Sequence, residues 1–173
     1  MLFGKSRKIE EEFLKAYDEN ADYIFRHCYL RINDRERARE LMQETFLKTW
    51  IYISKGEKIQ NLKAFLYKVA NNLVIDEFKK RKELKLEEIT MKKIIGENDF
   101  KERSHANIEA EDVIKLINSL DPKYQKVVIM RYIDSLSIKE IADILGKTEN
   151  NISVRLHRAL NQIKKIMHYE QRI

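Results

Sequence analysis

Residues 137–165 read SIKEIADILGKTENNISVRLHRALNQIKK, and the helix caps in this stretch predict its structure. Ser137 followed three residues later by Glu140 forms a capping box, so a short helix begins directly after Ser137. Gly146 is suited to the left-handed conformation that closes a helix. Thr148 then caps a longer second helix. A short helix, a glycine turn and a second helix together predict a helix-turn-helix.

The second helix has two different faces on a helical wheel. One face is apolar and is expected to pack inward; it holds Ile152, Leu156, Ala159, Leu160, Ile163 and Ile166. The other face combines amides, cations and a valine without any Asp or Glu. Such side chains read base edges and phosphates in the major groove of DNA. The candidate contacts are Lys147, Thr148, Asn150, Asn151, Ser153, Val154, Arg155, His157, Arg158, Asn161 and Lys165.

Upstream of the helix-turn-helix, residues 84–109 lose clear helical periodicity, are acidic and contain Gly96. We predict a flexible linker here. It separates an N-terminal domain, residues 1–83, from a C-terminal domain, residues 110–173, in which Asp121-Pro122 is a further helix start. In the N-terminal domain, helical patterns are centred on residues 8–18, 21–31, 34–53 and 61–82. With 4 Gly and 1 Pro among 173 residues, the predicted fold class is all-α, with two small helical domains.

The wheel of residues 34–53 places Leu47 and Ile51 one turn apart on an otherwise polar side that also carries Glu40, Gln43 and Glu44. An apolar pair framed by acids and amides is typical of a protein-binding face. The alternatives are that these are ordinary exposed apolar residues or that the helix is buried more deeply.

The wheel of residues 61–82 has a core stripe and an outer stripe. The core stripe holds Leu62, Phe65, Leu66, Val69, Ala70 and Leu73, and the outer stripe holds Tyr67, Lys68, Asn71, Asn72, Ile75, Phe78, Lys79 and Lys82. Lysines interleaved with aromatic rings and amides suit melted DNA, because cations meet phosphates and flat groups stack on bases. Packing against a partner is the main alternative for this stripe.

The excess of positive charge lies in two blocks. The chain carries a net +6, and residues 59–82 and residues 147–165 each hold four more basic than acidic residues. Two separate basic patches favour two contacts with one long polyanion. No apolar run is long enough to span a membrane, and the first residues are too short for a signal-peptide core, so we expect a cytoplasmic protein without direct membrane insertion.

Signatures of enzyme chemistry are missing from the sequence. There is no P-loop, no G-x-G-x-x-G, no H-E-x-x-H and no G-x-S-x-G motif, so we expect no enzyme activity, no catalytic residues and no cofactor. Cys28 is the single cysteine, which excludes an internal disulfide and every multi-cysteine zinc pattern. His27 beside it is predicted to be a packed helix residue, and no metal site is predicted.

Three segments, in this order, resemble the sigma-70 family of RNA polymerase sigma factors. Residues 38–50 (ARELMQETFLKTW) resemble the A-x-D-L-x-Q-E-x-F-x-x-x-W segment of region 2, with Glu40 in place of the usual Asp. Residues 62–76 followed by Lys79-Lys80-Arg81 resemble the next helix of that region, and residues 131–163 resemble region 4. The length, with no counterpart of the middle region, is similar to the extracytoplasmic-function (ECF) subgroup.

The resemblance implies a role for each face. The face of this chain that would bind the β′ coiled coil of the polymerase comprises Glu40, Leu41, Gln43, Glu44, Leu47 and Ile51. The −10 element would be bound by Lys55, Lys58, Asn61, Tyr67, Lys68, Asn71, Asn72, Lys79, Lys80, Arg81 and Lys82, and the −35 element by the second helix of the helix-turn-helix. The implied partners are the β′ and β subunits of the polymerase core, promoter DNA and an anti-sigma factor.

Two other functions remain open at the level of sequence. A stand-alone helix-turn-helix regulator with a helical dimerisation domain would use residues 34–53 as a dimer interface, but leaves the basic block at 59–82 unexplained. A helical adaptor that binds only proteins leaves both basic blocks unexplained.

Overall fold

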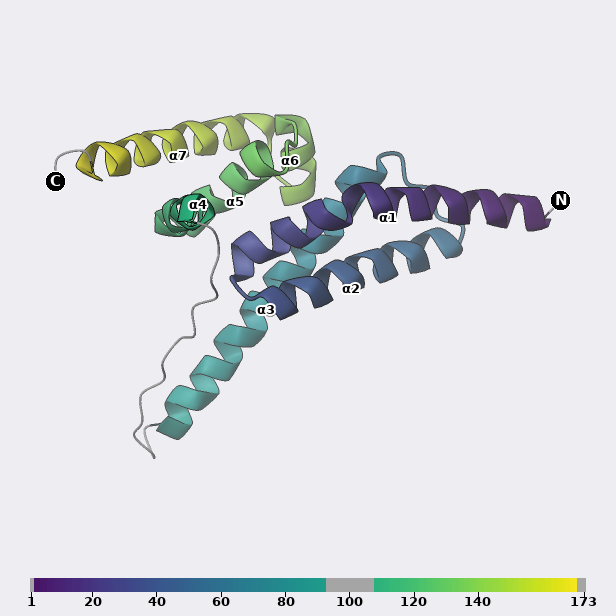
Figure 1. The fold of residues 1–173 in the computed structure, drawn as a ribbon, viewed down its shortest axis with the longest axis horizontal. Helices are drawn as coiled ribbons and strands as arrows, with labels where there is room; N and C mark the ends of the chain where they lie inside the picture. The colour runs from purple at the N-terminus through teal and green to yellow at the C-terminus, as the bar shows by residue number, and fades with distance from the viewer. Residues whose placement is uncertain (1, 93–107, 171–173) are drawn as a thin grey trace.

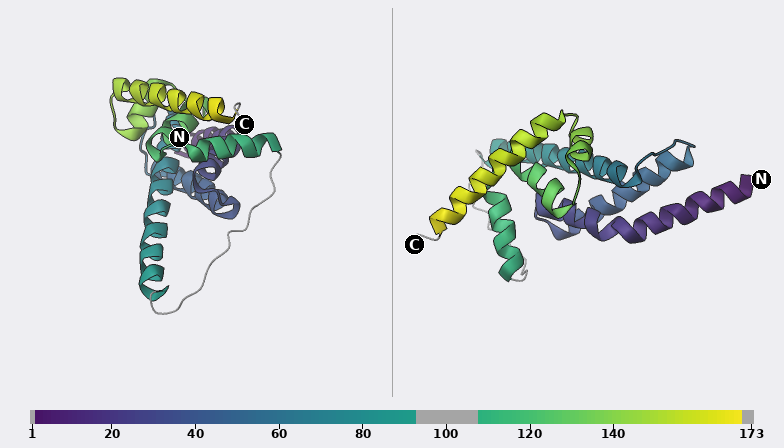
Figure 2. Two further views of the ribbon diagram at one scale, coloured as in Figure 1. Left: turned by 90° about the vertical axis from the view of Figure 1, so that its left-hand side faces the viewer. Right: turned by 90° about the horizontal axis from the view of Figure 1, so that it is seen from above.

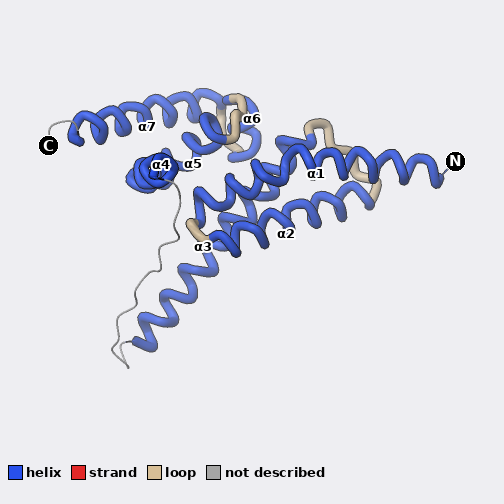
Figure 3. The backbone as a smooth tube through the Cα atoms, in the orientation of Figure 1, coloured by secondary structure: helices blue, strands red, loops and turns tan. Residues whose placement is uncertain are grey.

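The computed structural model describes the backbone of residues 2–92 and 108–170, and the side-chain surroundings of residues 9–84, 113 and 115–167. All regular elements in this part of the chain are helical (Figures 1 and 3). They are α1 (Leu2–Ile32), α2 (Arg35–Ser54), α3 (Leu62–Lys92), α4 (Ile108–Ser119), α5 (Pro122–Val128), the π-helical turn η1 (Ile129–Ile133), α6 (Ile138–Leu145) and α7 (Glu149–Glu170). The predicted all-α fold class is confirmed.

The helix boundaries follow the capping chemistry of the sequence. Asp34 accepts a hydrogen bond from the backbone N–H of Arg37 at 3.0 Å and caps α2. The capping box of Ser137 is complete, and Gly146 closes α6 with φ of 60°. The local predictions around the helix-turn-helix are therefore confirmed.

Two helices are longer than the sequence patterns indicate. The patterns at residues 8–18 and 21–31 belong to one continuous helix, α1, because Glu19 and Asn20 between them are neither Gly nor Pro and do not break it. Helix α3 continues to Lys92 and projects away from the rest of the molecule in two views (Figures 1 and 2). The predicted linker over residues 84–109 is therefore wrong for residues 84–92, which continue α3, and for residues 108 and 109, which begin α4, while residues 93–107 lie outside the described residues.

Helices α1, α2 and α3 pack against one another as the N-terminal body of the molecule. Aromatic side chains join α1 to α2: the ring of Phe13 lies 5.0 Å from that of Trp50, and the ring of Tyr17 lies 4.7 Å from that of Phe46. Buried Ala38 and Leu41 bring α2 close to the shared core. Such aromatic contacts add to the burial of apolar area in holding the pair together.

In the C-terminal body, α7 packs on both α5 and α6. Buried Ile152 and Leu156 anchor its first half, and Ala159 lies against Leu120 and Val128. Leu160, predicted to face inward, is 37% exposed, because it lies at the edge of this packed face. The apolar stripe of α7 therefore fixes which of its sides faces solvent.

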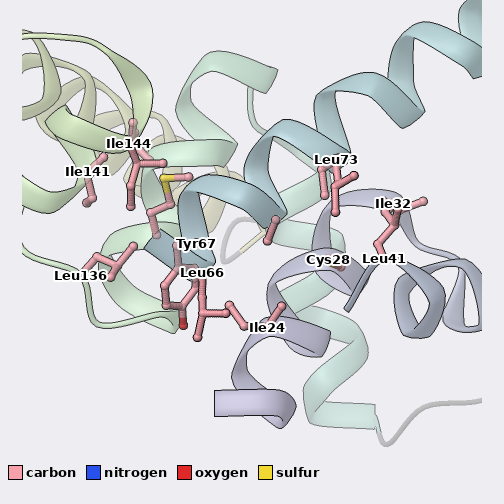
Figure 4. Packing of buried hydrophobic residues seen from close by; sticks show 14 of the residues in the cluster. Ile24, Cys28, Ile32, Leu41, Leu66, Tyr67, Leu73, Leu136, Ile141 and Ile144 are labelled. Carbon is pink, nitrogen blue, oxygen red and sulfur yellow. The ribbon is translucent and has the colours of Figure 1, made fainter. Parts of the chain in front are cut away.

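The two bodies share one core. A continuous cluster of buried residues includes Ile24, Leu66 and Tyr67 from the N-terminal body and Leu136 and Ile141 from the C-terminal body (Figure 4). Helix α3 contacts α6, and α1 contacts η1. The two basic segments, residues 59–82 and 147–165, therefore belong to bodies that are packed together.

Candidate nucleic-acid and polymerase interfaces

The outward face of α7 presents nearly all the predicted base and phosphate contacts to solvent. Exposed are Lys147, Thr148, Asn150, Asn151, Ser153, Val154, His157, Arg158, Asn161 and Lys165, and Arg155 is half-buried. After Glu149 in its first turn, α7 carries no acidic residue up to residue 167. The described face can therefore approach phosphates without opposing charge.

Thr148 and Ser153 also have structural roles. The hydroxyl of Thr148 accepts a hydrogen bond from the backbone N–H of Asn151 at 3.2 Å, which caps α7. The hydroxyl of Ser153 donates to the carbonyl of Glu149 at 3.0 Å. These local bonds hold the start of α7 rigid behind the turn at Gly146, as a helix that enters a groove requires.

The basic surface around α3 is only partly as predicted. Lys55, Lys58, Asn61, Lys68, Asn72, Lys79, Lys80 and Lys82 are exposed. Tyr67 and Asn71, which the wheel places outward, are buried with exposures of 0% and 2%. The side-chain oxygen of Asn71 accepts a hydrogen bond from Arg31 at 2.8 Å.

The outward placement of Tyr67 and Asn71 is wrong because α3 is packed on more than one side. A helical wheel assigns one buried face, but here α3 contacts α1, α2 and α6. Its supposed outer stripe is therefore split, with Tyr67 and Asn71 inside and Lys68 and Asn72 outside.

Arg81 is half-buried and held in an ion-pair network. It donates to Glu77 at 2.9 Å and to Asp34 at 3.0 Å. Burial raises the pKa of Glu77, but hydrogen bonds from Arg81 and Arg37 outweigh it and leave that pKa below its ordinary value. Arg81 thus joins α3 to the start of α2, a structural contact that the sequence motif does not indicate.

A groove between α2 and α3 adds residues that the sequence interpretation missed. Its open volume is about 380 Å³, and it is lined by Lys48, Tyr52, Phe65, Val69, Asn72, Leu73 and Asp76. The rings of Tyr52 and Phe65 lie 4.8 Å apart. Flat rings beside Lys48 and Asn72 suit an unstacked base. The wheel assigned Phe65 to the core, although it is only half-buried.

The predicted polymerase-binding face on α2 is largely exposed. Leu47 and Ile51 are 58% and 43% exposed, with Glu40 and Gln43 beside them. Glu44 forms an ion pair with Lys48 at 3.1 Å. Leu41 is an exception: it is 1% exposed and packs in the core, so its place among the surface contacts is wrong. It faces inward because it shares the buried side of α2 with Ala38 and Thr45.

A buried polar pair joins the two bodies and was not anticipated. His27 of α1 and Asp134, directly after η1, form a contact of 2.6 Å between Nδ1 and Oδ2. Both side chains have exposures of 1% or less. The packed position of His27 is as expected, but its partner lies 107 residues away, a separation that no local pattern reveals.

The described residues show neither a cluster of metal ligands nor a membrane-spanning helix. Within the described residues, no group of three or more His, Cys, Asp or Glu is placed to hold a metal ion. In the same part of the chain, no helix is long and apolar enough to cross a membrane.

Comparisons with known sequences match both bodies. A family model described as Sigma-70 region 2 matches residues 16–83, and one described as Sigma-70, region 4 matches residues 110–163. The chain is 27% identical over 166 residues to the ECF RNA polymerase sigma factor SigW of Bacillus subtilis, covering 90% of this chain and 89% of that protein. It is 28% identical over 163 residues to the ECF sigma factor BldN of Streptomyces coelicolor, covering 91% of this chain and 61% of that protein.

Solved structures show the same fold. The sigma factor RpoE of Bartonella quintana, solved with the anti-sigma factor NepR, superposes with a TM-score of 0.72 at 19% identity, covering 91% of this chain and 98% of that one. CnrH, solved with the cytosolic domain of CnrY, gives 0.71 at 16% identity, covering 92% and 90%. With regions 2 and 4 both present, the chain belongs to the sigma-70 family and is an RNA polymerase sigma factor of the ECF type.

Proposed function

We propose that the exposed faces of α2, α3 and α7 divide the work of promoter recognition: α2 binds the polymerase core, α3 with the loop before it binds the −10 element, and α7 binds the −35 element. The observation that carries the proposal is the outward face of α7, which is basic and amide-rich over residues 150–167 and contains no acid. The second basic surface, around α3, calls for a second DNA contact.

At the −35 element, α7 lies in the major groove. Asn150, Asn151 and Arg158 are the candidates for base edges, because amides pair with adenine and guanidinium with guanine. Lys147 and Lys165 contact phosphates on either side. The cap at Thr148 and the buried residues Ile152, Leu156 and Ala159 support this role. They fix α7 on the C-terminal body, so that the same face always points to solvent.

At the −10 element, the groove of Tyr52, Phe65 and Asn72 takes an unstacked base of the melted strand. Lys48 lines the same groove, and Lys68 lies exposed on α3. Stacking on aromatic rings stabilises a base once it has left the duplex. The exposed lysines before and along α3 follow the phosphates of the single strand. Tyr67 and Asn71 contact DNA only if their present packing is released.

In this proposal the protein catalyses no reaction. It binds the β and β′ subunits of the polymerase core and directs the core to specific promoters. A cytoplasmic location follows from that partner. An anti-sigma factor is a further proposed partner, supported by the solved relatives that were captured in complex with one.

Run-off transcription from a library of randomised promoters tests the proposal. Core polymerase with this chain should produce transcripts whose templates share two elements with a fixed spacing. There are two controls. One is core polymerase alone, and the other is core polymerase with a shortened chain that ends at residue 107 and lacks α7.

A stand-alone regulator predicts a different result. In that case the chain alone would protect a palindrome, and adding it to core polymerase would give no new start sites. That outcome would exclude the proposed division of work.

A further inference from the structure

The groove between α2 and α3 is longer than the site of one base. The two helices run antiparallel along it, since the rings of Tyr52 and Phe65 lie 4.8 Å apart at one end and Arg37 donates to Glu77 at 2.9 Å toward the other. The hollow that Phe65 lines also reaches Asp76 on the same helix. From residue 65 to residue 76 of a helix is about 16 Å, whereas a flat base is about 3.4 Å thick. A base stacked on the rings therefore fills only one end of the hollow.

The end of the hollow away from the rings is polar. It is lined by Asn72 and Asp76, one turn apart on α3, and by Lys48 of α2. The ammonium of Lys79 donates to Oδ1 of Asp76 at 3.2 Å, and the Asp76 side chain is 59% exposed. In the described part of the chain, Oδ2 of Asp76 makes no hydrogen bond or ion pair. One carboxylate oxygen is therefore open to a ligand in the groove.

A second hollow continues the groove beyond Asp76. Its open volume is about 320 Å³, and Lys48, Leu73 and Asp76 line both hollows. Lys48 forms its ion pair with Glu44, at 3.1 Å, and not with Asp76. A strand that follows the groove from the rings into the second hollow must therefore pass the Asp76 carboxylate.

A carboxylate only accepts hydrogen bonds, so it discriminates among the four bases. Adenine, cytosine and guanine each carry an exocyclic amino group that can donate to Oδ2 of Asp76. Thymine carries none, and its ring N–H lies between two carbonyl oxygens that the carboxylate repels. The amide of Asn72 both donates and accepts, so it does not make the same distinction.

Charge decides which part of the strand faces Asp76. The carboxylate repels phosphate, so a base and not the backbone is expected beside it. Lys79 and Lys80 are exposed and line the second hollow, where they can take the phosphates. The groove thus offers an acceptor for a base edge next to cations for the backbone.

We propose that the groove holds two successive unstacked nucleotides of the melted strand, one base on the rings of Tyr52 and Phe65 and the adjacent base beside Asp76, and that Asp76 selects a base with an exocyclic amino group and rejects thymine. The inference rests on the proposed function, because it takes this groove as the place where the −10 strand binds. It adds a second base position and the class of base that this position accepts.

Asp76→Asn tests the class of base. Core polymerase carrying the full chain is titrated with labelled single strands of the −10 element, in which each position is changed in turn to each of the four bases. At one position thymine should bind about tenfold more weakly than cytosine, the usual effect of one mismatched base. An amide in place of the carboxylate can donate to O4 of thymine, so the ratio should fall to about twofold or less in Asp76→Asn. An unchanged ratio would overturn the role of Asp76.

Glu83→Gln is the matched control. Glu83 is exposed and lines the second hollow, so this substitution removes the same charge from the same groove. It should strengthen the binding of all strands by one factor, because repulsion of phosphates does not depend on the base. If it changed the ratio of cytosine to thymine as much as Asp76→Asn does, the ratio would reflect the charge of the groove, and the proposed contact would be wrong.

Abasic nucleotides test whether the groove holds two bases. Removing the base at either of two adjacent positions should weaken the binding of the unchanged chain. Tyr52→Leu removes a ring but keeps an apolar side chain, and should abolish the effect at one position. Asp76→Asn should reduce the effect at the neighbouring position. If both substitutions act at the same position, the groove holds a single base and the second base position is overturned.

The outcomes separate this inference from the function on which it rests. If core polymerase with the unchanged chain binds none of the strands, the proposed function fails, and the inference fails with it. If the strands bind and both Tyr52→Leu and Lys48→Ala weaken them, but Asp76→Asn leaves the selection of bases unchanged, the groove still binds the −10 strand and only the inference is overturned.

Discussion

Arginine has opposite roles at two positions of this molecule, and the difference lies in solvation. Arg31 is buried, its pKa is lowered to about 10, chiefly by desolvation, and it donates to Asn71. Arg158 projects from α7 into solvent. A buried arginine must keep its protein partner, whereas an exposed one is free to exchange water for a base or a phosphate.

Arg158→Ala should affect one promoter position. If Arg158 binds a base edge, the loss is about 1–3 kcal/mol and is confined to one base pair of the −35 element. The loss is measured by comparing the binding affinity of the chain for a panel of −35 elements that differ by single bases. Lys164→Ala is the comparison, because removing an exposed lysine that contacts phosphate should weaken binding to all site variants equally. A uniform loss of binding for Arg158→Ala would mean that Arg158 contacts phosphate too.

Cys28 should react slowly with thiol reagents in the native protein. Burial raises its pKa to about 12, with a smaller opposing effect of Arg31. At pH 8 about one thiol in 10⁴ is then ionised, against about a quarter for an ordinary cysteine. Thiol titration with and without denaturant measures the difference, and equal native and denatured rates would mean that the thiol is accessible.

Individual helices divide their residues between packing and recognition. In α2, Ala38, Leu41 and Thr45 face the core while Leu47 and Ile51 remain exposed. The wheel predicts the outward side of Leu47 and Ile51 correctly, since a helix with one packed side obeys its wheel. The resemblance to the family motif placed Leu41 on the same surface, and that assignment fails because Leu41 is buried. In α3 the wheel itself fails at Tyr67, because a second body packs on another side.

Leu47→Glu should weaken binding to the polymerase core by about tenfold or more, because apolar contacts at the centre of an interface carry much of its free energy. Stability should change little, since Leu47 is 58% exposed. The affinity of α7 for DNA should also be retained. The control is Leu14→Glu on α1, at a similar exposure of 55%; equal weakening by both would contradict the face assignment.

Gly146→Ala should destabilise the helix-turn-helix by about 1–2 kcal/mol, the cost of a left-handed conformation for an ordinary residue. Nothing lies within 4 Å of the added methyl group, so the cost is conformational and not steric. Gly146→Asn should cost less, since Asn tolerates this conformation. Urea unfolding measures both, and a larger loss for Asn than for Ala would reject the explanation.

At the scale of the whole molecule, two sequence domains form one packed unit. The core runs from α1 and α3 into η1, α6 and the first half of α7. The alternation of apolar and polar residues predicts that each body has a core. It does not predict whether the two cores are continuous. The joining depends on the shapes of two finished surfaces.

The shared core predicts cooperative unfolding. Trp50 is the single tryptophan and packs in the N-terminal body, so its fluorescence reports that body alone. Circular dichroism reports the helices of both bodies. The two transitions should coincide on heating. Separate midpoints would show that the bodies unfold independently and would contradict a single shared core.

The sequence alone determined the helical class, the caps of the helix-turn-helix, the basic face of α7, the exposed pair on α2 and the family, because each depends on residues close together in the chain. Tertiary structure alone decided the burial of Tyr67 and Asn71, the groove of Tyr52 and Phe65, and the pairing of His27 with Asp134. Those features need surfaces from distant segments to meet, and helical periodicity carries no information about which surfaces do so.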